Sequence, residues 1–179
     1  LLTISTENLE TEKQLNDTIY TANETILQDL ERVLKGNSNL LTALIREEYY
    51  KFSTQKAELQ SKVAQAQINY NRYKTLFDKG VIAKAEFEKY QFDLQFTKQA
   101  LNSFVKQQMA NWQNKKNELT LQLKNIAGNN NKLKIEAKNY VLIAPATGTI
   151  ENFNGVQVGS VLNASQPIAQ ISPVDNLVV

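Results

Sequence analysis

The sequence predicts a mainly α protein, in which a long antiparallel coiled-coil hairpin of three helices carries a small, split β domain at its base. Apolar residues recur at alternating steps of four and three through most of residues 7–139, which is the pattern of a coiled-coil seam. All three prolines and three of the six glycines lie after residue 144, where short strand-like runs replace that pattern. The chain therefore divides into two parts of different kinds.

The composition excludes several classes of function. The 179 residues include no His and no Cys, so the chain offers no imidazole base, thiol nucleophile, disulfide or ordinary zinc site. The acidic residues follow no converging spacing, and we expect neither an enzyme nor a bound cofactor or metal. The formal net charge of +2 is too small to indicate nucleic-acid binding. No apolar run approaches the roughly 18 to 20 residues that span a bilayer.

The first predicted helix covers residues 7–35. Its apolar residues step by four and three, and Asp29 is the residue that breaks the series. The expected seam consists of Leu15, Ile19, Ala22, Ile26 and Val33. The cluster Lys-Gly-Asn-Ser-Asn at 35–39 contains helix-stopping and N-capping residues, so it separates this helix from the next.

The second predicted helix covers residues 40–78 and has the most regular seam. Nine of its ten seam positions are apolar or aromatic, with Lys56 as the exception. The positions are Ile45, Tyr49, Phe52, Lys56, Leu59, Val63, Ala66, Tyr70, Tyr73 and Phe77. Such a helix buries one continuous stripe against a partner helix.

The third predicted helix covers residues 84–139. Its seam consists of Phe87, Leu94 and Leu101 and, after a change of phase, Val105, Trp112, Leu119, Ile126 and Leu133. Residues 128–131 (Gly-Asn-Asn-Asn) have the composition of a loop, because Gly and Asn are poor helix formers by up to about 1 kcal/mol each. Since the seven-residue spacing from Ile126 to Leu133 continues across them, we expect one continuous helix, with a turn at Gly128 as the alternative.

The connection at residues 79–83 is short enough to force the second and third helices antiparallel, and it forms the tip of the hairpin. The first two helices are together longer than the third, so the first must tilt, splay or overlap with the second. Residues 7–31 carry seven acids and one base, whereas residues 98–138 carry eight lysines and two acids. This complement predicts that the first helix lies against the C-terminal half of the third. Anionic lipid or nucleic acid is an alternative partner for the Lys-rich stretch.

Residues 140–175 read as a small β segment. Strand-like runs at 140–143, 149–150, 156–158, 160–162 and 168–171 are separated by Gly, Pro and Asn. About 40 residues make too small a core to fold well alone. Residues 1–5 have the same character as residues 167–172, so we expect the two ends of the chain to meet in one β domain.

Three runs in this segment carry a family resemblance: residues 140–150 (YVLIAPATGTI), 158–161 (VGSV) and 166–171 (QPIAQI). They resemble the second half of the biotinyl/lipoyl-like domain of haemolysin-D type membrane-fusion proteins, the periplasmic adaptors of bacterial secretion and efflux machines. In that family the domain is split around a long helical hairpin. The resemblance implies that residues 1–6 end the first half, 140–175 form the second half, and 176–179 begin a following barrel strand.

The residues of the implied lipoyl-like turns are Ala144, Pro145, Gly148 and Gly159. True lipoyl domains carry a modified lysine in a tight hairpin between their halves. The helices occupy that place here, so the resemblance implies no lipoyl or biotinyl group.

The tip carries a second resemblance to this family. Adaptors that dock onto a TolC-like outer-membrane channel have an Arg at the tip, a Leu four residues later and a Ser seven residues further on. Arg72 and Leu76 match, and Ala83 stands at the third position without the hydroxyl. The implied channel-docking tip consists of Arg72, Leu76, Lys79, Gly80, Val81, Ile82 and Ala83. Spacing alone favours the alternative, in which Arg72 is a solvated helix residue and Leu76 a neighbour of the seam.

The resemblance implies a non-catalytic periplasmic adaptor for type I secretion or efflux. It would link an inner-membrane transporter, expected to be of the ABC type, to a TolC-like channel, and self-associate into a ring, expected to be a hexamer. The inner-membrane anchor would lie outside this sequence. Two alternatives stay open: an accessory protein of a Gram-positive ABC exporter, which has no channel to dock, and a coiled-coil scaffold without a role in transport.

Overall fold

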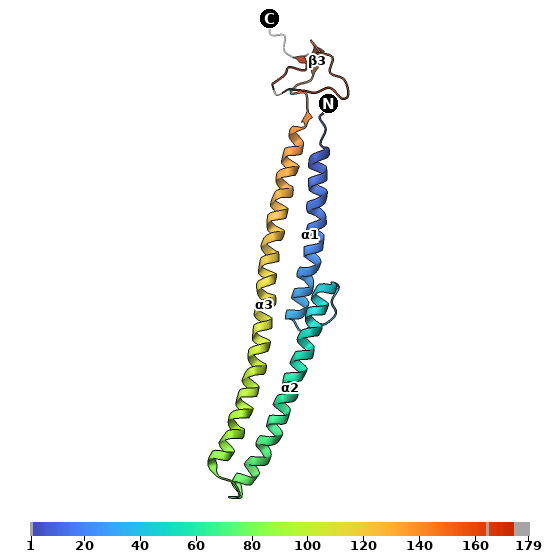
Figure 1. Ribbon diagram of the computed structural model, residues 1–179. Helices are drawn as coiled ribbons and strands as arrows, with labels where there is room; N and C mark the ends of the chain where they lie inside the picture. The colour runs from blue at the N-terminus through green and yellow to red at the C-terminus, as the bar shows by residue number, and fades with distance from the viewer. Residues whose placement is uncertain (1, 164, 174–179) are drawn as a thin grey trace. The chain divides into compact units, whose positions relative to one another are not determined.

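The computed structural model describes residues 2–163 and 165–173, which form three helices and four short strands (Figure 1). Their order is β1 (Leu2–Thr3), α1 (Glu7–Leu34), α2 (Ala43–Asp78), α3 (Lys84–Asn139), β2 (Val141–Leu142), β3 (Gly148–Glu151) and β4 (Gln170–Pro173). The predicted mainly helical class is confirmed. The chain divides into a helical unit, Lys13–Asn130, and a terminal unit, Leu1–Glu12 with Asn131–Val179.

The first helix stops where the sequence places its glycine. Gly36 has φ 78°, and its N–H donates to the carbonyl of Val33 at 3.0 Å, while the N–H of Asn37 donates to the carbonyl of Arg32 at 2.8 Å. This pair of hydrogen bonds is a Schellman motif, which needs a left-handed residue that glycine adopts without steric cost. α1 therefore ends at Leu34, one residue before the predicted end.

In the helical unit, α2 runs antiparallel to the first half of α3 (Figure 1). The rings of Tyr73 and Tyr90 stack with centroids 3.5 Å apart near the turn that joins the two helices. Farther from the turn, the rings of Phe52 and Phe104 stack with centroids 5.6 Å apart. These pairs come from the predicted seam of α2 and from the matching face of α3.

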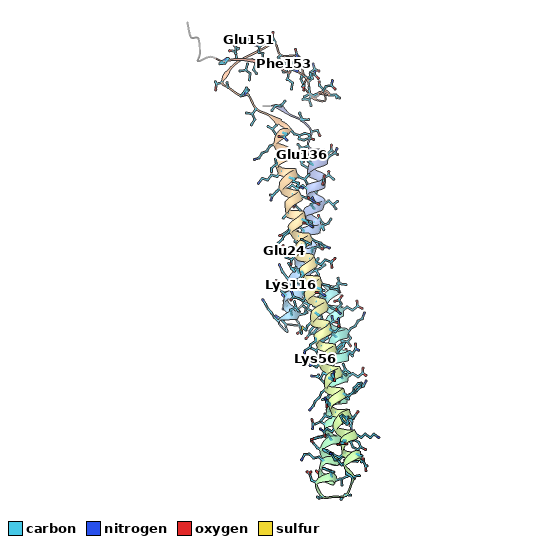
Figure 2. All side chains as sticks on the ribbon, turned by 90° about the vertical axis from the view of Figure 1, so that its left-hand side faces the viewer. Glu24, Lys56, Lys116, Glu136, Glu151 and Phe153 are labelled. Atoms are coloured by element: carbon cyan, nitrogen blue, oxygen red, sulfur yellow. The ribbon has the colours of Figure 1, made fainter. Side chains whose placement is uncertain are left out.

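The later part of α3 lies beside α1, as the charge complement predicted. Lys116 Nζ is 3.0 Å from Glu31 Oε1, and Figure 2 shows Lys116 next to the C-terminal turns of α1. Asn130 Nδ2 donates to Asp17 Oδ1 at 2.7 Å. Among the ion pairs of the described residues, Glu31–Lys116 is the one that joins these two helices, so the many other acids and lysines do not hold them together.

α3 is one uninterrupted helix with the predicted bounds, Lys84–Asn139. The prediction of continuity across residues 128–131 is confirmed, and the alternative of a turn at Gly128 is wrong. The hydrogen bond from Asn130 to Asp17 gives this weak stretch a partner on α1. Buried Leu123 and Leu133 lie on either side of the stretch and anchor the helix there.

The main hydrophobic cluster, here called the junction, lies where the end of α1 and the start of α2 meet the middle of α3 (Figure 1). Its buried members are Leu30, Val33, Leu40, Ile45, Phe52 and Trp112. Of the three alternatives predicted for the first helix, the overlap with the second therefore occurs, and it places both helices against α3 at one level. Burial of large apolar side chains makes this the principal stabilising region of the helical unit.

Two details of the helices correct the expectations. The predicted start of the second helix at residue 40 is wrong, because α2 begins at Ala43. The predicted seam of the first helix is also wrong over its first half, since Leu15 and Ile19 are 59% and 41% exposed. The row that lies toward α3 instead consists of Asn16, Tyr20, Asn23, Leu27 and Leu30. Burial of Leu30 and Val33 in the junction sets the rotation of α1, and steps of three and four from Leu30 lead to this row.

In the terminal unit, β1 pairs antiparallel with β2, with Leu2 opposite Leu142 and Thr3 opposite Val141. The predicted meeting of the chain's two ends is therefore found. β3 pairs antiparallel with β4, from Gly148 opposite Pro173 to Glu151 opposite Gln170.

The strands predicted at 156–158 and 160–162 are not formed in this described region of the chain. Residues 158–159 form a turn instead, in which the N–H of Ser160 donates to the carbonyl of Gln157 at 3.0 Å, and the residues around it are irregular. With no neighbouring strand to supply a hydrogen-bonded ladder, strand-like composition alone does not hold them extended. The predicted barrel strand at 176–179 lies outside the described residues.

Candidate functional site

The turn between α2 and α3, residues 79–83, is the candidate site, and is here called the tip. Gly80 has φ 71°, and its N–H donates to the carbonyl of Phe77 at 2.8 Å. The N–H of Val81 donates to the carbonyl of Leu76 at 2.9 Å. This second Schellman motif ends α2 and turns the chain within three residues of the start of α3. The tip is thus a tight, defined turn and not a flexible loop.

Ala83 stands at the N-cap position of α3. Its carbonyl accepts hydrogen bonds from the N–H of Glu86 at 3.1 Å and of Phe87 at 3.2 Å. A Ser here would also offer a side-chain oxygen to the free N–H groups of the first turn, and alanine has none. Ala83 therefore starts α3 through its backbone carbonyl alone, and the first turn lacks a side-chain cap from this position.

The tip exposes apolar surface at the end of the two helices. Val81 is 65% exposed, whereas Ile82 is half-buried against the turn. Lys79, Gly80 and Ala83 are exposed. The structure therefore brings together five of the seven predicted docking residues, and Val81 is the large apolar side chain that faces outward.

Arg72 and Leu76 lie on α2, outside the tip. Leu76 is half-buried, and Arg72 is exposed eight residues before Gly80, which is about 12 Å along the helix axis at 1.5 Å per residue. Arg72 makes no ion pair with any residue in the described ranges. Its position on the side of the helix separates it from the apex.

Aromatic rings fill the space between the helices behind the tip. The rings of Phe77 and Phe87 stack with centroids 5.0 Å apart, and Tyr70 packs against Phe87 at 5.6 Å. The hydrogen bond with Tyr73, together with desolvation, raises the pKa of Tyr90 to about 12. Such ring pairs stabilise the packing by more than the burial of their apolar area alone, so the tip rests on a rigid base.

The four predicted lipoyl-like turn residues lie at separate places in the terminal unit. A Cβ on Gly148 would lie 2.8 Å from the carbonyl carbon of Ser172 and 2.9 Å from Cγ2 of Ile171, so this position in β3 excludes a side chain. Gly159 has φ 89° in the turn after Gln157. Ala144 and Pro145 are exposed and follow β2.

A hollow of about 830 Å³ opens in the terminal unit, lined mainly by apolar side chains. Ile143, Ile150 and Phe153 line it and are 73%, 64% and 55% exposed. Ala144 and Pro145 belong to its wall. The four described strands thus leave much of their apolar surface uncovered, which agrees with the expectation that this segment is too small to bury a complete core.

Sequence reasoning missed the most buried polar group of the helical unit. Asp29 is fully buried, and its carboxylate accepts hydrogen bonds from the N–H of Leu41 at 3.0 Å and from the N–H and hydroxyl of Thr42 at 2.6 and 2.7 Å. Arg32 Nη1 lies 3.2 Å from Oδ1. Burial acts to raise the pKa of Asp29, but these donors lower it below the ordinary value. The signal was the break that Asp29 makes in the apolar series of the first helix.

A second missed contact joins α2 and α3 at the junction. The indole Nε1 of Trp112, whose side chain is fully buried, donates to Glu48 Oε2 at 3.3 Å, and Lys115 pairs with the other oxygen of that carboxylate. Glu31 is held similarly by Lys116, and this ion pair lowers the pKa of Glu31. Both carboxylates serve the packing of helices and show no arrangement for acid–base chemistry.

Within residues 2–163 and 165–173, no cluster of acidic side chains is placed to hold a metal ion. None of the helices in this part of the chain combines the length and the apolar character needed to span a bilayer. Comparison of the sequence with protein-family models and with curated proteins, and of the structure with solved structures, gave no match.

Proposed function

We propose that this chain is part of a periplasmic adaptor subunit of the haemolysin-D type, which links an inner-membrane transporter of the ABC class to a TolC-like outer-membrane channel. The observation that carries the proposal is the tip. A tight glycine turn joins two long antiparallel helices and holds one exposed apolar side chain, Val81, at their end. An apolar side chain held on a rigid turn can fill a pocket of a partner with little loss of conformational entropy.

In this proposal α2 and α3 form a coiled-coil hairpin, and hairpins of several copies stand side by side in a ring. The ring wall encloses the path of the cargo, and the tips meet the channel end to end. The successive layers of stacked aromatic rings between α2 and α3 support such a role, because they keep the hairpin stiff over its length.

The terminal unit is proposed as the lipoyl-like domain. Pairing of β1 with β2 supports this, since it joins segments from before and after the helices in one sheet. The uncovered apolar hollow beside Ile150 and Phe153 also supports it, because the other half of a split β domain is the kind of surface that fits there.

The experiment replaces the exposed apolar residue of the tip. In Val81→Asp we expect loss of export and of co-purification with the channel, while the free energy of unfolding stays within the change typical of surface substitutions, about 0.5 kcal/mol. Leu121→Asp is the matched control, because Leu121 is similarly exposed at 61% but lies on α3 far from the tip. Intact export in Val81→Asp would contradict channel docking and favour the Gram-positive exporter accessory. If neither channel nor transporter co-purifies and export does not need the chain, the scaffold alternative stands.

A further inference from the structure

Two large aromatic side chains lie exposed on α3 near the tip. Phe92 is 66% exposed and Phe96 is 73% exposed, and they are one helical turn apart. With Lys89, Tyr90 and Asp93 they line a surface hollow of about 490 Å³. Phe92, Asp93 and Phe96 are here called the α3 socket. Asp93 has no ion-pair partner among the residues that the structure describes, so its carboxylate is available to a ligand.

The chemistry of the socket suits a guanidinium group. An aromatic face attracts a cation within about 6 Å of its centroid, and arginine is the cation found most often in such contacts. A carboxylate beside the rings adds a planar, two-pronged acceptor for the same group. Lys89 also lines the hollow and repels a guanidinium group, and the negative charge of Asp93 offsets this repulsion.

α2 presents a matching pair on its outer side. Ile68 is 53% exposed, and Arg72, one turn further on, is exposed and unpaired within the described residues. These two residues are here called the α2 patch. Each is two positions from Tyr70, which packs between the helices, so each points about 200° away from that seam.

The socket lies on the opposite side of the pair of helices. Phe92 is two positions from Tyr90, which stacks in the seam, and Phe96 is two positions from buried Leu94. By the same rotation of about 200°, the socket faces away from α2. The α2 patch and the α3 socket of one chain therefore cannot meet each other.

The patch and the socket nevertheless lie at the same level along the helices. Two contacts between α2 and α3 fix their register: the stack of Tyr73 on Tyr90, and the hydrogen bond from Lys98 Nζ to Gln67 Oε1 at 3.0 Å. Each such cross-helix contact is here called a rung. The patch lies between these rungs on α2 and the socket lies between them on α3. Because the helices are antiparallel, Arg72 is level with Phe92 and Ile68 with Phe96.

We propose that the α2 patch of one copy of this chain binds the α3 socket of a neighbouring copy. The Arg72 guanidinium packs against Phe92 and pairs with Asp93, and Ile68 packs against Phe96. Copies placed around an axis parallel to the helices keep every residue at its own height, so complementary faces at one level make a head-to-tail contact that can close into a ring. This rests on the proposed function, whose ring it specifies, and it gives Arg72 a partner other than the channel.

The test uses introduced cysteines, because the chain has none of its own. Gln65→Cys and Gln99→Cys are purified separately, mixed and treated with a short thiol-specific crosslinker. Both residues are exposed, each lies three positions from Ile68 or Phe96 on the same face, and all residues of the contact stay in place. We expect crosslinked dimers in the mixture and none in either variant alone, since the contact joins different faces. Thr54→Cys mixed with Gln99→Cys is the control, because Thr54 is also exposed on the outer side of α2 but lies about 16 Å from Gln65 along the helix. Equal crosslinking in the control mixture, crosslinking of a variant with itself, or no crosslinking would overturn the proposal.

Sedimentation of the chain without cysteines gives a second measurement. We expect Arg72→Ala to weaken self-association about tenfold, equivalent to about 1.4 kcal/mol, and Arg72→Lys to weaken it less. If neither variant changes association while Val81→Asp still abolishes channel binding, the contact is wrong and the adaptor proposal stands. If the crosslink forms but Val81→Asp has no effect on channel binding, channel docking is wrong and the contact between copies stands.

Discussion

The carboxylate of Asp29 on α1 caps the first turn of α2 at Thr42. Oδ2 accepts the N–H of Thr42 at 2.6 Å and its hydroxyl at 2.7 Å, while the Thr42 side chain makes no cap to its own helix. A capping group normally comes from the N-cap residue itself. Here it comes from 13 residues earlier, on another helix, so the hydrogen bonds that start α2 also fix where α2 stands relative to α1.

Asp29→Asn should destabilise the chain by about 2 kcal/mol, because the amide replaces a charged acceptor by a neutral one and places an N–H₂ among donors. Glu24→Gln is the matched control, since Glu24 is an exposed acid on the same helix, and it should cost within about 0.5 kcal/mol. Urea unfolding of both variants measures the difference. Equal free energies of unfolding in the two variants would show that the Asp29 cap does not contribute to stability.

The same residue predicts how stability depends on pH. The pKa of Asp29 in the folded chain lies below its ordinary value of 3.8, so the stability that it contributes is fully present above that value and is lost as the pH falls through the folded pKa. Melting temperatures measured between about pH 2 and 6 should therefore fall more steeply in the wild type than in Asp29→Asn. Parallel curves would contradict this assignment.

Gly128→Ala should stabilise the chain by up to about 1 kcal/mol. Gly128 lies inside α3, and a Cβ there would meet no atom within 4 Å, so alanine gains helix propensity without a clash. Gly80→Ala is the contrasting control, because φ 71° at the tip is costly for any residue with a Cβ by roughly 1 to 2 kcal/mol. Thermal unfolding should move the two melting temperatures in opposite directions. A loss of stability in Gly128→Ala would indicate a break in the helix.

Ala83→Ser should stabilise the start of α3 by about 1 kcal/mol. The serine hydroxyl would accept an N–H of the first turn, and Glu86 stands three residues on, where a capping box places its acidic partner. Ala110→Ser, at an exposed position in the middle of α3, is the control and should be slightly destabilising. The melting temperature of the isolated chain separates this effect from any change in channel binding. An unchanged melting temperature would show that a serine here does not cap α3, so that any effect of Ala83→Ser would concern docking alone.

Trp112 should report on the junction, because it is the single tryptophan and is fully buried. Its fluorescence should resist aqueous quenchers until the helices separate, and Trp112→Ala should cost about 3 to 5 kcal/mol. Phe96→Ala is the comparison for a large aromatic lost from an exposed site, and we expect at most about 0.5 kcal/mol from it in dilute monomer. Similar losses in the two variants, measured in urea, would show that the junction does not dominate stability.

Much of the helical part could be predicted from the sequence, because its boundaries depend on residues that are close together in the chain. α1 and α2 stop at Schellman motifs that depend on Gly36 and Gly80, and such a motif involves only the last few residues of its own helix. The bounds of α3 and its continuity past Gly128 followed from an apolar spacing within one segment. The meeting of the chain's two ends was predicted from the strand-like character of residues 1–5, but the partner strand was not, because those residues resemble 167–172 and β1 pairs with β2 instead.

What only the tertiary structure decided depends on contacts between distant residues. α2 begins at Ala43, after Thr42, whose residue type favours an N-cap; but the group that caps Thr42 is Asp29 on α1, and no local pattern predicts that contact. α1 turns Asn16 toward α3 and leaves Leu15 exposed, because the junction fixes its rotation more strongly than the apolar stripe does. The region 156–162 is irregular, with a turn at 158–159, despite its strand-like composition, since a strand requires a neighbour to complete its hydrogen bonds and composition does not supply one.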